Sequence, residues 1–261
     1  MAKNKTMNRH ILSLLLFLAI FGVKNSLFSQ ASISDSSILL PNLKLGASAG
    51  FPSNDLKKTF GTSAIINTKF DVKFKSQWFI GAQYNFLFGG SVKDSGMLDE
   101  LITDGGGIIN TNGEFGTFEM LQRGHHVGIH VGRLFSVLAP NANSGIITSF
   151  GVGIFTYKIN FNNISGDLIQ LNGEYSKGYD RYTAGNSFTE FIGYQYFSNN
   201  RLANFYAGVE FTQAFTKIRR GYQVDFEEND PRFGARMDNI FSIQVGWILP
   251  LYKRPPKEFY Y

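Results

Sequence analysis

Strict alternation of apolar with small or polar side chains is the dominant pattern of this chain, and it recurs from about residue 64 to residue 252. Each alternating stretch runs for roughly a dozen residues, enough for a strand to cross a bilayer, and polar loops separate the stretches. The C-terminal stretch is the clearest, with these apolar side chains on one face of a strand: Phe241, Ile243, Val245, Trp247, Leu249 and Leu251. Ser242, Gln244 and Gly246 share the other face. The pattern predicts strands with lipid on one side and a tight polar interior on the other.

The N-terminus has the three-part pattern of a secretory signal peptide. Basic residues come first, an apolar run follows at 11–23, and small and polar residues complete the segment at 25–31. We expect cleavage near Ser29 or Ala31, which removes residues 1–29. A membrane anchor is the alternative, but the run is shorter than the roughly 20 apolar residues that a spanning helix needs.

Charge and cysteine content exclude several classes of function. Removing residues 1–29 takes away four basic residues and no acidic one, so the formal net charge falls from +5 to +1. No basic stripe with interleaved aromatic residues remains, so no nucleic-acid partner is predicted. The chain has no cysteine, which excludes a disulfide framework, a thiol nucleophile and a lipid-modified cysteine.

The period of two divides the remaining chain into eight strands. We expect them at about 42–51, 63–74, 78–88, 118–135, 146–161, 187–197 and 204–217, with the last strand ending at 252. No other stretch suits a membrane helix, and only a closed sheet pairs every backbone amide in lipid. The sequence therefore predicts an all-β, eight-stranded antiparallel transmembrane up-and-down β-barrel at 42–252. A periplasmic segment at 30–41 precedes it, and a periplasmic tail at 253–261 follows.

The lengths of the connections predict the orientation. They are short after the second and sixth strands, intermediate after the fourth, and long after the third, fifth and seventh. Outer-membrane barrels have short turns on the periplasmic side and long loops outside the cell, so we expect an outer-membrane location with both termini periplasmic. Aromatic residues expected at the periplasmic lipid headgroups are Trp78, Tyr194, Tyr196, Trp247 and Tyr252.

Five charged residues share the strand face that carries the glycines: Lys44, Lys69, Asp71, Lys73 and Glu210. A soluble barrel would place such charges outside and its apolar residues inside. In a barrel of eight strands the side chains fill the interior, so we expect a network of salt bridges among these charges. A small-solute or ion channel is the alternative that a charged interior leaves open.

Histidine and acidic residues supply little evidence for chemistry. His126 and His130 share a face with His125 beside them, but they are about 13 Å apart along a strand, too far to bind one metal ion. Small outer-membrane lipid-modifying enzymes use His together with Ser or Asp. No serine neighbour of these histidines is distinguished in the sequence, so such an enzyme ranks only as the second alternative. Acidic residues at 94–104 suit a solvated loop better than a calcium site. We therefore predict no catalytic residue, cofactor or metal ion.

Two segments are candidates for partner contact. The first lies in the loop before the sixth strand and contains Tyr179, Asp180, Arg181 and Tyr182. In the simpler interpretation, Asp180 or Arg181 pairs with a neighbouring loop; in the functional one, the segment contacts a partner, because Tyr and Arg are favoured at interfaces. The second is the tail, which ends in Phe259, Tyr260 and Tyr261 and which Pro255 and Pro256 keep extended.

The signal peptide, eight strands and short turns resemble the outer-membrane barrel superfamily of OmpA/OmpX-like proteins. Segments 178–181, 205–211 and 246–254 are similar to PorT/PorG-like barrels of the Bacteroidota. The resemblance implies a bilayer-embedded, non-enzymatic structural or interaction component. It also implies envelope protein partners, such as those of a type IX-like secretion complex or an assembly complex.

Overall fold

The computed structural model describes residues 37–198, 203–227 and 230–251. The expected signal peptide, most of segment 30–41, and the tail with Phe259, Tyr260 and Tyr261 lie outside these residues. The strands within them are β1 (Leu40–Ser53), β2 (Ser63–Lys73), β3 (Trp78–Gly89), β4 (Ile108–Ile109), β5 (Phe115–Phe135), β6 (Gly145–Ser165), β7 (Thr183–Tyr196), β8 (Phe205–Ile218) and β9 (Arg236–Pro250). The helices within them are α2 (Asn54–Thr59) and the 3-10 helices η1 (Ser95–Leu101), η2 (Ile169–Leu171), η3 (Tyr175–Gly178) and η4 (Pro231–Phe233).

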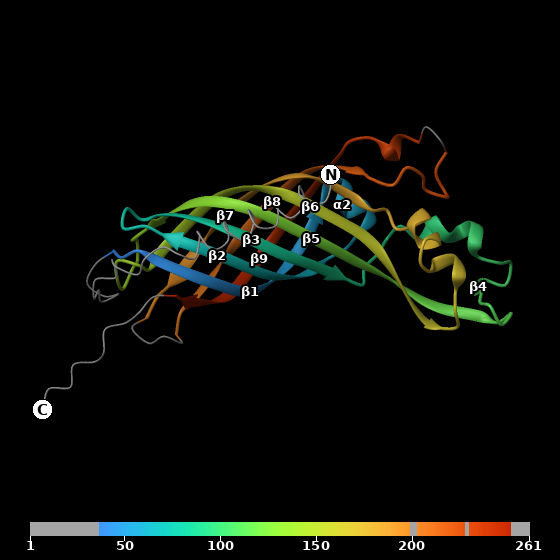
Figure 1. Ribbon diagram of the computed structural model, residues 1–261, viewed down its shortest axis with the longest axis horizontal. Helices are drawn as coiled ribbons and strands as arrows, with labels where there is room; N and C mark the ends of the chain where they lie inside the picture. The colour runs from blue at the N-terminus through green and yellow to red at the C-terminus, as the bar shows by residue number, and fades with distance from the viewer. Residues whose placement is uncertain (1–36, 199–202, 228–229, 252–261) are drawn as a thin grey trace, which may run out of the picture. The chain divides into compact units, whose positions relative to one another are not determined.

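The sheet closes on itself. Consecutive long strands pair antiparallel, β3 pairs with β5, and β1 pairs with β9, so eight strands form a ring (Figure 1). The two-residue strand β4 is an addition that pairs only with the far end of β5. The eight-stranded antiparallel up-and-down barrel predicted from the sequence is confirmed.

The register of the pairs fixes the size and tilt of the barrel. One circuit of directly paired residues runs through Trp78, Arg133, Thr148, Ile192, Val209, Ile243, Ala49, Ala64 and Phe88. It returns to β3 at residue 88 after starting at residue 78, so the stagger around the barrel is ten residues. Eight strands with this stagger tilt by about 40° and enclose a space that side chains fill.

Polar side chains point inward and apolar ones outward. On β2 the buried residues include Asn67, Lys69 and Asp71, whereas Ile66 is 52% exposed. On β5, Ile129 is 61% exposed. A soluble barrel has the opposite arrangement, and a predominantly apolar exterior of this extent requires lipid as its solvent. The expected assignment of faces is confirmed, and the fold is a transmembrane β-barrel.

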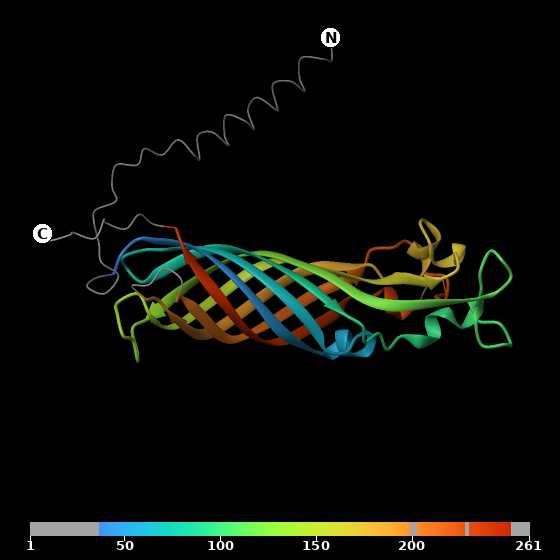
Figure 2. The ribbon, with the colours of Figure 1, turned by 90° about the horizontal axis from the view of Figure 1, so that it is seen from below.

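Long connections gather at one end of the barrel and short turns at the other (Figure 2). The turn end holds the connections 74–77 and 136–144, with residues 197–198 and 203–204 at the ends of β7 and β8. The opposite end holds 54–62, 90–114, 166–182, 219–227 and 230–235, with α2 and the four 3-10 helices. Among the described residues, no helix is long and apolar enough to cross a membrane.

The structure extends the expected strands at the end that carries the long connections. Strands β5 and β6 have 21 residues each, about twice what a bilayer requires. Their far ends therefore extend out of the membrane as two antiparallel strands, which stay paired as far as Thr117 and Ser165. The strand expected at 187–197 begins four residues earlier, at Thr183. Helix α2, which follows β1, was not expected.

Candidate functional site

The long connections form one ordered unit, which we call the loop head and define as residues 54–62, 90–120, 160–182, 219–227 and 230–235. Its apolar core includes Leu56, Phe60, Met97, Leu98, Ile108, Leu168, Leu171 and Tyr179, all buried. Helix α2 contributes Leu56 from a short segment with Asp55 in its first turn and Lys57 and Lys58 in its last, an order that suits the helix dipole. This core is continuous with buried side chains at the adjoining ends of the barrel strands, among them Ile65, Leu87, Phe155 and Ile240, so the loop head packs onto the barrel.

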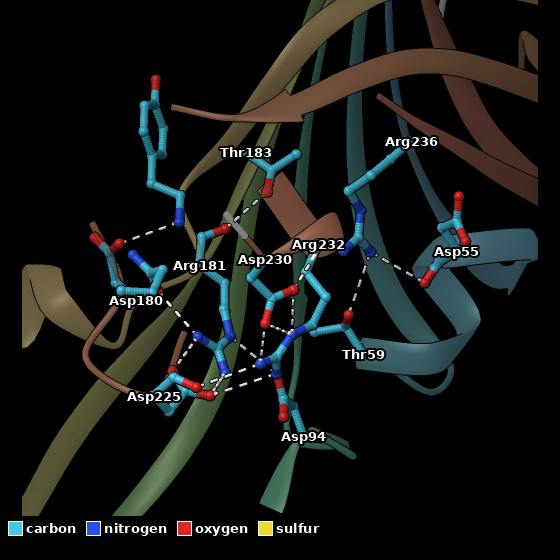
Figure 3. A network of polar contacts seen from close by, with 12 residues as sticks. Asp55, Thr59, Asp94, Asp180, Arg181, Thr183, Asp225, Asp230, Arg232 and Arg236 are labelled. Atoms are coloured by element: carbon cyan, nitrogen blue, oxygen red, sulfur yellow. Dashed lines mark hydrogen bonds and ion pairs between the residues drawn. The ribbon is translucent and has the colours of Figure 1, made fainter. Parts of the chain in front are cut away.

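Arg181 holds three of these connections together. Its side chain is buried, its Nε donates to Asp94 Oδ2 at 3.0 Å, and its two terminal nitrogens donate to the Asp225 carboxylate at 2.6 and 2.5 Å (Figure 3). Nη1 also donates to Gln223 Oε1 at 3.2 Å. The guanidinium lies 4.2 Å from the centre of the Phe226 ring. Arg181 has φ 50°, an uncommon value for a residue with a side chain, so the contacts stabilise a strained backbone.

The environment of Arg181 keeps it charged. Burial by itself lowers the pKa of the guanidinium, but hydrogen bonds and attraction from Asp225 and Asp94 outweigh burial and raise that pKa. A buried cation with two hydrogen-bonded carboxylates is compensated, whereas removal of any one partner leaves a charge without its counterpart. Arg181 is therefore a structural centre of the loop head.

The residues predicted as partner contacts lie around this centre. Asp180 accepts from Arg220 Nε at 3.0 Å and from the backbone N–H of Tyr182 at 3.1 Å. Tyr179 belongs to the apolar core of the loop head. Tyr179, Asp180 and Arg181 are buried and join loops to one another, and Tyr182 is half-buried. A contact of this segment with another protein stays a prediction.

A cavity of about 370 Å³ opens beside Arg181. Its charged lining comes from α2, the following loops and the start of β9: Asp55, Lys58, Asp94, Arg181, Arg232 and Arg236. Arg236 Nη2 donates to the backbone oxygen of Asp55 at 3.1 Å, and Arg232 pairs with Asp230 (Figure 3). The volume suits a small ligand, and the lining offers hydrogen bonds and charge for binding. Sequence reasoning missed Arg232 and Arg236, because nothing in the spacing of separate loops brings them together.

Inside the barrel, the predicted charges form two separate pairs. Lys44 Nζ and His130 Nε2 each lie 2.7 Å from an oxygen of Asp71, and Lys69 Nζ lies 2.7 Å from Glu210. All five side chains are 6% exposed or less. The space left beside Lys44, Lys69 and Asp71 is about 10 Å³, which holds no more than about one water molecule. The interior is packed at this level.

Lys73 lies apart from the other charges predicted for the interior. Its Nζ donates to Ser37 Oγ at 3.1 Å and to the backbone oxygens of Ile38 and Phe74 at 3.3 Å each. These acceptors come from the chain before β1 and from the turn after β2. Lys73 therefore fastens the turn end of the barrel.

The histidines also occupy defined places. His125 faces outward and lies 2.8 Å from the hydroxyl of Tyr84. His126 faces inward with its Nε2 3.0 Å from Ser187 Oγ, a serine neighbour that the sequence did not distinguish because it lies 61 residues away. Both residues of this pair are 2% exposed or less, so a substrate could reach them only by displacing the packed interior. Among the described residues, no group of three or more His, Cys, Asp or Glu could hold a metal ion.

The fold and its polar interior define the class of this protein as a small transmembrane β-barrel of the outer-membrane type. No protein-family model and no curated protein matches the chain. Among solved structures, it is similar to the attachment invasion locus protein Ail of Yersinia pestis, with 10% identity, a TM-score of 0.41, and coverage of 81% of this chain and 99% of Ail. It is also similar to neisserial surface protein A, with 9% identity, a TM-score of 0.38, and coverage of 79% of this chain and 96% of that protein. For the outer membrane protein OprG from Pseudomonas aeruginosa, the identity is 10%, the TM-score is 0.38, and the coverage is 85% of this chain and 100% of OprG. Identities and TM-scores this low carry no conclusion about function.

Proposed function

We propose that this protein is a non-enzymatic interaction component of the outer membrane, in which a packed barrel anchors a loop head that binds a partner at the cell surface. In this proposal, the loop head lies outside the cell and both termini lie in the periplasm, because long connections belong to the outer side. The bilayer is the first partner, and an envelope protein is the second.

One observation carries the proposal: the loop head exposes large apolar side chains although it has an apolar core in which to bury others. They are Ile102, Ile109, Phe115, Ile164, Ile169, Tyr175, Tyr222 and Val224. These side chains lie outside the bilayer, where a partner protein that covered them would remove apolar surface from water. Because the Arg181 contacts already order the loops, little conformational entropy remains to be lost on binding.

In its finer form, the proposal makes this protein an accessory subunit of an envelope secretion complex, type IX-like, or of an assembly complex. Its support is the resemblance of segments 178–181, 205–211 and 246–254 to barrels of such machinery. The loop head supplies a surface of the kind that a subunit needs.

We expect substitutions in the loop head to release the partner. Tagged full-length protein is extracted from native outer membranes in mild detergent, and mass spectrometry identifies the proteins that co-purify. Phe115→Ser with Tyr222→Ser, at two of the most exposed apolar positions (59% and 60%), should reduce recovery of the partner about tenfold or more. Leu138→Ser, in the turn after β5 and 86% exposed, is the matched control and should leave recovery unchanged. A solitary barrel, or equal loss in the control, would contradict the proposal.

The packed interior argues against the channel alternative. We expect planar-bilayer recordings of the wild-type protein to show no conductance steps, since salt bridges and aromatic rings fill the path. Phe79, Phe191 and Tyr206 are buried among the interior charges, and their combined replacement by alanine should produce conductance. That variant is the positive control, with heat-modifiable migration in gels confirming that the barrel is folded. Steady steps from the wild-type protein would favour the channel instead.

A further inference from the structure

One acidic residue interrupts the apolar exterior. Glu190 is exposed on the outward face of β7, between the apolar Phe188 and Ile192. On the same strand, Asn186 lies four residues away toward the loop head, and Tyr196 lies six residues away toward the turn end. A strand tilted by about 40° advances roughly 2.5 Å per residue along the barrel axis. Glu190 is therefore about 10 Å or more from either position, near the middle of an apolar band that is about 25 Å tall.

Neighbouring strands do not satisfy this carboxyl group. The residues paired with Glu190 are Phe150 on β6 and Phe211 on β8. Glu190 forms no hydrogen bond or ion pair with any other residue of the described ranges. Its side chain is too short to reach water at either edge of the apolar band. Whether charged or protonated, the group faces hydrocarbon without a hydrogen-bond partner, an arrangement that membrane proteins avoid by pairing such residues.

Aromatic side chains flank Glu190 on its own strand and on both neighbouring strands, which suits the face to packing. Phe150 and Phe188 stack with their ring centres 6.1 Å apart, and Phe188 meets Phe215 edge-on at 6.2 Å. Contact between proteins in a bilayer depends on such van der Waals packing together with hydrogen bonds between polar groups, because lipid is as apolar as the side chains. The face therefore offers both kinds of interaction, with the single carboxyl group at its centre.

We propose that this face, comprising Phe150, Phe188, Glu190, Ile192 and Phe211, binds a second copy of the chain, and that the two Glu190 carboxyl groups hydrogen-bond to each other. Two copies inserted in the same direction are related by a twofold axis along the membrane normal, so a residue on the axis meets its own counterpart at the same depth. A pair of carboxyl groups that holds a proton has both a donor and an acceptor. Glu190 is thus complementary to itself, whereas any other partner would need a suitably placed donor at mid-depth. The inference does not depend on the partner of the loop head.

Cross-linking tests the interface directly, because the chain has no cysteine of its own. Ile192→Cys is exposed beside Glu190 and should form a disulfide-linked dimer when native membranes are oxidised. Phe70→Cys is the matched control: β2 is four strands from β7 in either direction around the barrel, and Phe70 is also exposed to lipid. It should remain monomeric.

Substitution of Glu190 then tests the carboxyl pair. Glu190→Gln keeps a donor and an acceptor and should retain the Ile192→Cys dimer. Glu190→Leu removes both and should lower the cross-linked fraction at least tenfold, while heat-modifiable migration shows that the barrel still folds. Absence of a dimer in the wild-type background, or undiminished cross-linking in Glu190→Leu, would overturn the proposal. Cross-linking of Ile192→Cys to a different protein would also overturn it and assign the face to a hetero-complex.

Discussion

Replacement of Arg181 by alanine is expected to lower the free energy of unfolding of the loop head by about 3 kcal/mol or more while the barrel stays folded. The change leaves the carboxylates of Asp94 and Asp225 without the cation between them and removes the stacking on Phe226. Hydrogen exchange, followed separately for the loop head and for the strands, measures the effect. Faster exchange should appear in residues 90–120, 219–227 and 230–235 before it appears in β1 or β9.

Two further variants make this prediction specific. Arg181→Lys should not restore protection, because an ammonium group cannot make the paired contacts with Asp225 and a separate bond to Asp94. Lys177→Ala removes a solvent-exposed ion pair with Glu174 in the same connection and should change exchange little. Equal exchange in Arg181→Ala and the wild-type protein would show that the apolar core alone orders the loop head.

A second large effect is expected from separating the buried pair of Lys69 and Glu210. Glu210→Leu leaves the ammonium group of Lys69 in a packed interior with 6% of its side chain exposed, and the barrel should lose about 3–5 kcal/mol of stability. Lys69→Met should cost a similar amount, because it leaves the carboxylate of Glu210 buried without a cation. The double variant should return close to wild-type stability, because two apolar side chains replace a compensated pair.

Urea unfolding of the four proteins in lipid vesicles measures this cycle. Lys217→Met, on the exposed face of β8, is a control for the loss of a lysine and should have little effect. If each single substitution is tolerated as well as the double one, water must reach the pair. The interior would then be hydrated, and the channel alternative would gain support.

The barrel itself could be predicted from sequence because its environment imposes the period of two. Lipid on one side and a packed polar interior on the other favour apolar side chains at the outward positions of a crossing strand and small or polar ones at most inward positions. Burial along β2 therefore follows the alternation that the sequence shows, from Ser63 to Lys73. Pairing of adjacent strands then requires only the order of the chain.

The loop head could not be predicted in the same way, since outside the bilayer no period is imposed. Arg181 contacts Asp94 and Asp225, which are 87 and 44 residues away in the sequence, and no sequence spacing predicts those contacts. Helix α2 is only six residues long and gives too short a pattern to detect. Glu190 is different, because its position among apolar residues of the same face is visible in the sequence once that strand is assigned.

Closure through β1 and β9 has a consequence for biogenesis. Asn42 pairs with Pro250, 208 residues later, so the ring cannot be completed before nearly the whole barrel sequence is present. Until then the sheet has two free edges, whose unpaired backbone groups can capture strands of other chains. A partly assembled barrel is therefore the species most liable to aggregate. Safe assembly requires that the chain be kept from forming a sheet until its first and last strands can meet.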